Sequence, residues 1–317
     1  MKTLIGIAAL LGSTAVFGHD AQAQTVEDPL FQGRALTFSA GIYAPFNTLG
    51  GTLTTPNGGG ARVQSTDALD FGAGARIDVT YSELWSGNSR IVFNFAMSQA
   101  AGEENITVAG ADQTFPGSYD DGFRLPAGFR YNTTLKTETE MLSIGREWDV
   151  GGGWRVNAGL KAGQASQDFM ILSYNPAGAL SRTLQTTSEN KMYGVFGGVG
   201  HFRPISKTTW LRLSGTVGVM YNSFDYAYTN TNVGVGVDQS VTGSSDGAVV
   251  STQVSASVER QLPGLGVVSF EVGYDGLHGV GNGADTFLDV AGTATTAHID
   301  RDSIGAGYIS LGYTYLF

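Results

Sequence analysis

The last nine residues of the chain alternate bulky apolar side chains with small or polar ones and end on an aromatic residue. Because successive side chains of a strand point to opposite faces, all the bulky residues share one face. These residues are Ile309, Leu311, Tyr313, Tyr315 and Phe317. A strand with an apolar outside and a small or polar inside is typical of a transmembrane β-barrel. The alternative is a soluble edge strand, which would need a partner to cover it.

The same strand resembles an assembly signal. Leu311, Tyr313, Tyr315 and Phe317 end the chain on an aromatic residue, with further aromatics two and four positions earlier. This pattern is similar to the C-terminal signal by which the assembly machinery of the Gram-negative outer membrane recognises its clients. The resemblance implies that the barrel-assembly machinery is a partner during biogenesis. It also implies that the mature protein lies among outer-membrane lipid and lipopolysaccharide.

The start of the chain predicts export. Lys2 precedes an apolar run at 4–17, and Ala21, Gln22 and Ala23 supply the small residues that a signal peptidase needs. The run is too short for a helical membrane span, which needs about 20 apolar residues. We therefore predict a cleaved signal peptide at 1–23 and a barrel at 35–317. Between them, 24–34 is expected to be a short periplasmic segment, too short to plug a lumen.

The amino-acid composition excludes several kinds of chemistry and several classes of partner. The chain has no cysteine, which excludes disulfides and thiolate chemistry. It has 46 glycines against 8 prolines, a balance that suits many strands with a crowded inner face. No nucleotide-binding or zinc-binding motif stands in a suitable context, and there is no basic tract. We predict no cofactor, no metal site and no nucleic-acid partner.

Reading the chain with a period of two predicts an all-β fold, a transmembrane antiparallel up-and-down β-barrel. Ten strands fit best, an even number as bacterial single-chain barrels require, with eight or twelve as the alternatives. The clearest strand alternates strictly from Leu69 to Tyr81. The ten predicted strands lie at about 35–44, 69–81, 90–98, 137–150, 154–163, 191–202, 210–221, 249–261, 268–275 and 309–317.

Connection lengths set the expected orientation. Short connections of about four to eight residues alternate with long ones of about 25 to 40, and in such barrels the short turns are periplasmic. The five long loops are then extracellular and both termini are periplasmic. Trp85, Trp148, Trp154 and Trp210 lie in or beside the short turns, so we expect them to form an aromatic belt at the inner membrane interface. Chance placement is the alternative.

Polar residues that alternate with the outward ones are expected to line the interior. Opposite charges among them either pair across the lumen, since an unpaired buried charge is costly, or line a water-filled path and set ion preference. Ten strands leave room for at most a narrow pore. The candidates are Arg76, Asp78, Asn94, Arg155, Asn157, Lys161, Arg212, Gln253, Glu259, Glu271 and Asp275.

The predicted long loops carry most of the net negative charge. Such an acidic mouth would favour cations or bind divalent ions that bridge to lipopolysaccharide. Ordinary solvated loop surface is the alternative. The omptin proteases, also ten-stranded, place an Asp pair and an Asp-His pair in extracellular loops. Asp120 with Asp121, and Asp275 with His278, resemble those pairs weakly.

From about Leu142 onward the order of segments resembles a pore-forming outer-membrane family typified by the Legionella major outer membrane protein. The resemblance rests on 144–154, which ends Gly151-Gly152-Gly153-Trp154, on 158–160 and 167–169, on the Gly-rich 192–200, and on the closing 311–313. It implies an outer-membrane pore former and carries over no individual functional residue.

The leading hypothesis is therefore a narrow passive porin-like channel for ions or small polar solutes, with no chemical step. The alternative is a structural or surface-interaction barrel of adhesin or receptor type, without transport. An omptin-like surface protease is a distant third. The solute and the oligomeric state do not follow from the sequence.

Overall fold

The computed structural model describes residue 28 and residues 33–45, 52–53, 64–65, 74–107, 113–114, 124–125, 128–234, 236–288 and 294–317. The predicted signal peptide at 1–23, and Asp120 and Asp121, lie outside the described residues. No helix in the described part of the chain is long and apolar enough to cross a membrane.

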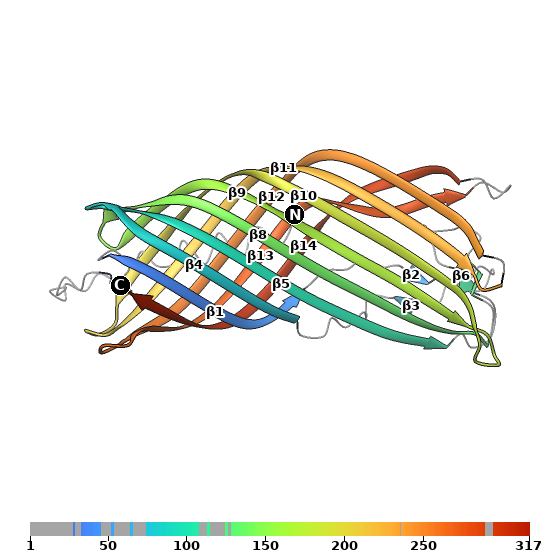
Figure 1. The fold of residues 1–317 in the computed structure, drawn as a ribbon, viewed down its shortest axis with the longest axis horizontal. Helices are drawn as coiled ribbons and strands as arrows, with labels where there is room; N and C mark the ends of the chain where they lie inside the picture. The colour runs from blue at the N-terminus through green and yellow to red at the C-terminus, as the bar shows by residue number, and fades with distance from the viewer. Residues whose placement is uncertain are drawn as a thin grey trace.

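One closed antiparallel barrel contains most of the described chain (Figure 1). Within the described ranges its strands follow one another around the ring as β1 (Arg34–Pro45), β14 (Ala294–Leu316), β13 (Gly266–Leu288), β12 (Gly236–Leu262), β11 (Thr209–Asn232), β10 (Leu180–Pro204), β9 (Trp154–Tyr174), β8 (Arg130–Gly151), β5 (Ser89–Thr107) and β4 (Gly74–Ser86). Two short pairs stand apart: β2 (Thr52–Leu53) with β3 (Gln64–Ser65), and β6 (Gln113–Thr114) with β7 (Arg124–Leu125). The predicted all-β, antiparallel fold is confirmed.

The barrel closes where the two ends of the chain meet. β1 pairs with β14 from Ala35 opposite Leu316 to Pro45 opposite Ala306, and its other edge pairs with β4. The backbones of Arg34 and Phe317 exchange hydrogen bonds of 3.2 and 3.1 Å at this end. This pairing joins the first and last strands of the ring, and it leaves no edge of the sheet unpaired at that seam.

Several strands are longer than predicted, and they occupy most of three predicted long loops. β9 ends at Tyr174 and β10 begins at Leu180, β11 ends at Asn232 and β12 begins at Gly236, and β13 ends at Leu288 and β14 begins at Ala294. The first of these connections is a tight turn in which the Gly178 amide donates to the Asn175 carbonyl over 2.8 Å. Gly178 has a φ of +83°, which favours glycine. The predicted strand ends were wrong because the alternation of apolar residues stops where the pairing of the strands continues.

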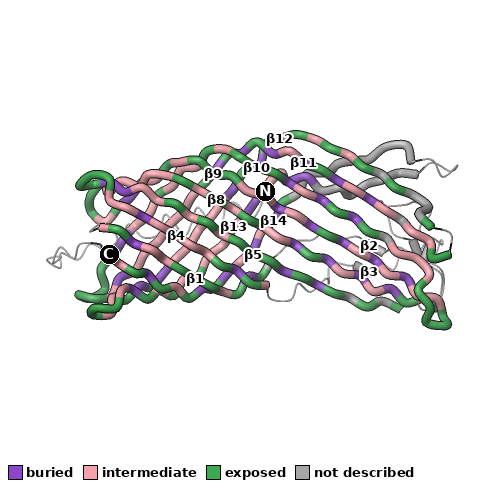
Figure 2. The backbone as a smooth tube through the Cα atoms, in the orientation of Figure 1, coloured by how far each residue is buried: buried purple, intermediate pink, exposed green. Residues whose placement is uncertain are grey.

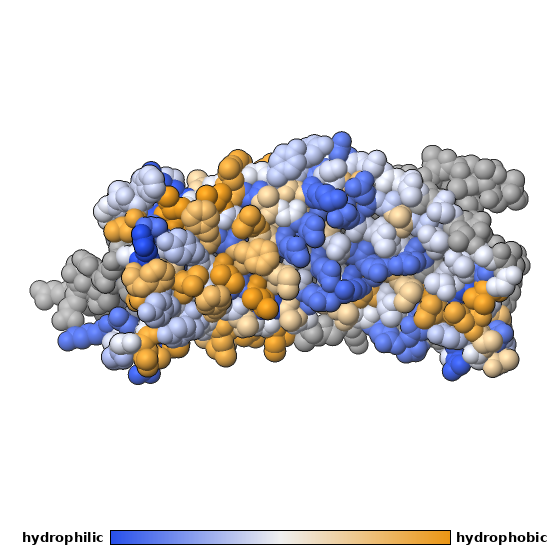
Figure 3. Space-filling model, viewed as in Figure 1, coloured by the Kyte–Doolittle hydropathy of each residue, from blue (hydrophilic) through white to orange (hydrophobic). Residues whose placement is uncertain are grey.

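An apolar belt surrounds the half of the barrel that holds Arg34 and Phe317. Buried and exposed residues alternate along the strands (Figure 2), and apolar side chains gather over this half while hydrophilic ones cover the next stretch (Figure 3). The exposed apolar side chains of the belt include Phe38, Ile42, Ile77, Phe93, Phe95, Leu142, Ile144, Leu160, Val195, Val217, Val219, Phe270, Ile309 and Leu311. The other residues of the predicted assembly signal, Tyr313, Tyr315 and Phe317, are exposed on the same outer face.

The belt has the height of a membrane. On β9 it runs from Trp154 to Ala162, after which Gln164 takes the next outward position. Nine residues at about 3.3 Å each, tilted by about 40°, span about 23 Å, close to the usual height of about 25 Å for the lipid-facing band of a barrel. Tyr193 and Tyr221, with ring centroids 5.1 Å apart, mark its far edge. β10, with 25 residues, continues well beyond that edge.

A charge placed in the middle of this belt should destabilise the folded protein. Leu160 is 61% exposed on the outer face of β9, so Leu160→Arg would put a guanidinium into hydrocarbon. We expect a loss of about 2–4 kcal/mol in urea unfolding from lipid vesicles. Thr187→Arg, on the outer face of β10 beyond the tyrosine edge, should cost less than about 1 kcal/mol. Equal losses at the two positions would contradict the placement of the belt.

Candidate functional site in the barrel interior

The structure places the eleven predicted interior residues on the face opposite the belt. Each occupies the inward frame of its strand, alternating with outward residues: Arg76, Asp78, Asn94, Arg155, Asn157, Lys161, Arg212, Gln253, Glu259, Glu271 and Asp275. Arg76, Arg155 and Glu259 are buried. The interior residues divide into two polar groups and one apolar group along the barrel.

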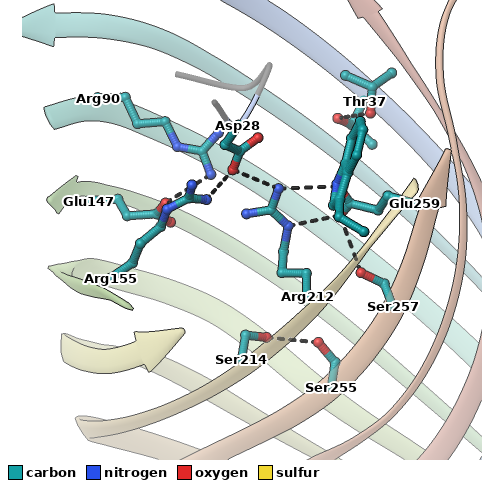
Figure 4. Close-up of polar contacts among 12 residues, drawn as sticks. Asp28, Thr37, Arg90, Glu147, Arg155, Arg212, Ser214, Ser255, Ser257 and Glu259 are labelled. Atoms are coloured by element: carbon teal, nitrogen blue, oxygen red, sulfur yellow. Dashed lines mark hydrogen bonds and ion pairs between the residues drawn. The ribbon is translucent and has the colours of Figure 1, made fainter. Parts of the chain in front are cut away.

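The first group lies at the end of the barrel that holds Arg34 and Phe317, and we call it the Asp28 layer (Figure 4). It combines three carboxylates with three arginines, namely Asp28, Glu147, Glu259, Arg90, Arg155 and Arg212. The Asp28 carboxylate lies between Arg155 and Arg212, in contact with Arg155 and 3.0 Å from Nη2 of Arg212. Every member interacts with a charge of opposite sign, which offsets the desolvation of the buried ions.

The two glutamates of the layer pair with different arginines. Glu259 Oε1 accepts from Arg212 Nε over 2.8 Å and from Ser257 Oγ over 3.2 Å. Glu147 Oε1 is 3.0 Å from Nη2 of Arg90. Arg90 was absent from the predicted interior residues. It lies two residues before Val92 on the same strand, so the sequence alternation already indicated that it points inward. Glu147 was missed because its strand alternates irregularly.

Aromatic rings complete the layer, and one of them corrects the predicted tryptophan belt. Trp210 is fully buried, and its indole Nε1 donates to the Glu259 carboxylate. Trp85 and Trp154, by contrast, are exposed at 66% and 51%. Trp148 has the Arg146 guanidinium 5.5 Å from its ring centroid. Trp210 stands two residues before the inward Arg212, so strand alternation already indicated its direction.

Asp28 belongs to the segment 24–34, which was predicted to be a short periplasmic segment too short to plug a lumen. Its side chain is only 3% exposed among the interior arginines. Residues 24–27 and 29–32 lie outside the described residues. No periodic pattern surrounds Asp28, so strand alternation could not have placed it. Its position follows from the attraction between its carboxylate and two buried guanidinium groups.

The second polar group lies deeper in the barrel, around Arg76. The Arg76 guanidinium is 2.7 Å from Oδ2 of Asp78, contacts Asp275, and lies 4.0 Å from the ring centroid of Tyr308. The Tyr308 hydroxyl donates to Glu271 over 2.6 Å. Strand alternation predicted the charged members of this group. It could not predict that Arg76 on β4 would contact Asp275 on β13, because these two strands are not neighbours in the ring.

A cavity of about 90 Å³ adjoins the Arg76 group. Five of the predicted residues contribute to its lining: Arg76, Asn94, Lys161, Gln253 and Asp275. Among the described residues, no carboxylate pairs with Lys161, which directs an ammonium group into this space. A buried ammonium is costly without hydration, and the cavity is large enough to hold water.

An apolar layer fills the interior on the far side of the cavity. Seven strands contribute one or more side chains to it: Met141, Ala165, Met192, Met220, Val249, Leu277, Val280 and Ile304. Just beyond it, Gly281 exchanges hydrogen bonds with the Asn190 side chain of β10, with N···O distances of 2.7 and 3.1 Å. A Cβ at Gly281 would meet the ring of Phe224 at 2.2 Å, so only glycine fits there. The register between β13 and β14 shifts between His278 and Val280, just before this point.

The structure separates the residues of the proposed protease pair. Asp275 faces inward and contacts Arg76. His278 faces the outer side, where its ring nitrogens lie 3.2 Å from Thr252 Oγ1 and 3.1 Å from Ser303 Oγ. The two side chains therefore do not form an Asp-His pair. Within the described part of the chain, no group of three or more histidines and carboxylates is placed to hold a metal ion.

No protein-family model matches the chain, and no curated protein sequence matches it. Its structure is similar to that of the outer membrane protease OmpT from Escherichia coli, with 12% identity and a TM-score of 0.44 over 90% of this chain and 97% of that chain. It is also similar to the translocator domain of the autotransporter NalP from Neisseria meningitidis, with 13% identity and a TM-score of 0.40 over 100% of this chain and 95% of that chain. A major outer membrane protein from Thermus thermophilus has 15% identity and a TM-score of 0.32 over 89% of this chain and 99% of that chain. At these identities and TM-scores, the similarities assign no function to the chain.

Breaking the Asp28 layer should destabilise the protein far more than breaking an ion pair on the outer face. Arg212→Met leaves Asp28 and Glu259 without a shared guanidinium, and we expect a loss of about 3–5 kcal/mol in urea unfolding. The control is Lys191→Met, which breaks the exposed pair with Glu189 and should cost less than about 1 kcal/mol. Similar losses in the two variants would show that the interior pairs are hydrated like surface pairs.

Proposed function

We propose that the protein is a narrow outer-membrane channel for ions or small polar solutes. The ten strands of the ring form its transmembrane wall, and both chain termini face the periplasm. Lipid and lipopolysaccharide are its surroundings, and the barrel-assembly machinery is its partner during biogenesis. The resemblance to the pore-forming family typified by the Legionella major outer membrane protein supports the same assignment. No chemical step is part of this function.

The membrane placement rests on the outer surface. The apolar belt, with aromatic side chains near both of its edges, matches the lipid-facing band of a transmembrane barrel. At the end that holds Arg34 and Phe317 every connection between strands is short, as expected for periplasmic turns. The two long connections, from β1 to β4 and from β5 to β8, lie at the opposite end. The long strands on the other side then project above the membrane.

The observation that carries the channel proposal is the cavity beside Arg76. It lies between the Asp28 layer and the apolar layer and is lined by charged side chains of both signs. A charged space that is large enough to hold water can form one section of an ion path through a barrel. Charges along such a path set the ion preference. The Asp28 layer and the apolar layer close the space in the state described here. Conduction therefore requires both to rearrange, which predicts small and infrequent openings.

A second candidate is a surface-interaction barrel without transport. The strands β8 to β12 continue beyond the belt and present polar side chains around a shallow outer groove of about 720 Å³. Lys136, Glu138, Asp168, Glu189 and Asp225 lie along this groove. Such a projecting polar surface suits contact with lipopolysaccharide or with another cell surface. The conductance experiment below separates the two candidates.

Reversing the charge of Lys161 should change the ion preference of the channel. In planar bilayers with a salt gradient, we expect Lys161→Glu to shift the reversal potential toward cation selectivity, because the new carboxylate faces the cavity. Lys136→Glu makes the same charge change on the outer face of β8 and should leave the reversal potential unchanged. Repeated absence of conductance steps with folded wild-type protein would overturn the channel and favour the second candidate.

A further inference from the structure

One carboxylate of the Asp28 layer differs from the others in its origin. Glu147 lies on β8 and Glu259 on β12, so the barrel wall itself holds both side chains in place. Asp28 belongs to no strand, and it precedes the first strand of the ring by several residues. Its carboxylate nevertheless occupies the position between Arg155 and Arg212 (Figure 4). The wall therefore supplies two guanidinium groups, and a separate part of the chain supplies their ligand.

The surroundings of this carboxylate are those of a built binding site. Arg155 comes from β9 and Arg212 from β11, and both guanidinium groups lie near the ring of Phe202, at 5.3 and 5.7 Å from its centroid. Glu259 holds Arg212 from the opposite side through Nε. The pair with Glu259 fixes the direction of the Arg212 guanidinium before a ligand arrives. The Arg155 guanidinium lies 3.7 Å from Glu147. Arginine recognises carboxylates well because its planar group offers several donors in a rigid arrangement.

We propose that Arg155 and Arg212 form a carboxylate-binding site at the periplasmic end of the lumen, and that Asp28 is its intramolecular ligand. Because Asp28 is tethered to the barrel, its effective concentration at the site is high and free carboxylates do not compete. When the Asp28 side chain is removed, the same site accepts a small free monocarboxylate. The ligand restores the charge balance of the layer, in which three arginines face three carboxylates.

The test is chemical rescue of Asp28→Ala by sodium formate. The variant should melt at a lower temperature than the wild type, because Arg155 and Arg212 lose a shared partner. Formate should raise the melting temperature of the variant in a concentration-dependent way, with half of the effect at millimolar concentration, since a ligand that binds only the folded state stabilises it. Formate should leave the wild type unchanged. Sodium chloride replaces formate at equal ionic strength in the reference samples.

Two control variants separate a specific site from a general salt effect. Glu83→Ala removes the partner of Arg34 from an exposed ion pair at the same end of the barrel, and it should show no response to formate. Asp28→Asn fills the same volume without a charge, so it should be destabilised without being rescued. The double variant Asp28→Ala with Arg155→Met should also lose the rescue.

The rescue experiment measures stability and the bilayer experiment measures conductance. A failure of the carboxylate-binding site can therefore be distinguished from a failure of the channel. No response of Asp28→Ala to formate, or an equal response to formate and chloride, would overturn the site. An equal response of Glu83→Ala would do the same. If Asp28→Ala does not fold, its refolding yield in formate and in chloride becomes the measurement. A higher yield in formate supports the site, and equal yields overturn it.

Discussion

The structure depends on the closure of the sheet between β1 and β14. Once these strands pair, every strand of the described ring has a neighbour on both sides, and the backbone satisfies its own hydrogen bonds. Only such a closed sheet can place strands in lipid, where exposed backbone groups find no water. Closure also divides the side chains of each strand into an outer and an inner set. The apolar belt and the polar interior are two consequences of this one constraint.

The inward-facing arginines need carboxylate partners, and the strands of the barrel wall supply only some of them. Arginines point inward from β4, β5, β9 and β11, and buried guanidinium groups are costly without partners. Around Arg76, carboxylates of the wall supply those partners. In the Asp28 layer the wall supplies Glu147 and Glu259, and the third carboxylate comes from outside the strands. The Arg76 group is therefore held by the wall alone, whereas the Asp28 layer depends on a carboxylate that the proposed carboxylate-binding site would exchange for a free ligand.

Sequence reasoning succeeded where direction is a local property. The inward positions of Lys161 and Asp275 and the outward positions of Leu311 and Tyr313 follow from a period of two. It failed where the type of a residue was given more weight than its phase, that is, its inward or outward position in the alternation of the strand. Trp210 was assigned to the membrane interface as a tryptophan beside a turn, but its phase is that of Arg212, and it donates to Glu259 inside the barrel. The end of apolar alternation near Lys191 was likewise taken as the end of a strand.

Alternation along the chain is sufficient to establish the class of fold, the seam between its first and last strands, and the two faces of each strand. Each of these depends on the backbone geometry of neighbouring residues. Only the tertiary structure decided which charges pair, that Asp28 enters the lumen, and that an apolar layer fills the interior beyond the cavity. Those facts depend on distances between residues far apart in the chain, such as Asp28 and Arg212, or Asn190 and Gly281. No local period encodes such distances.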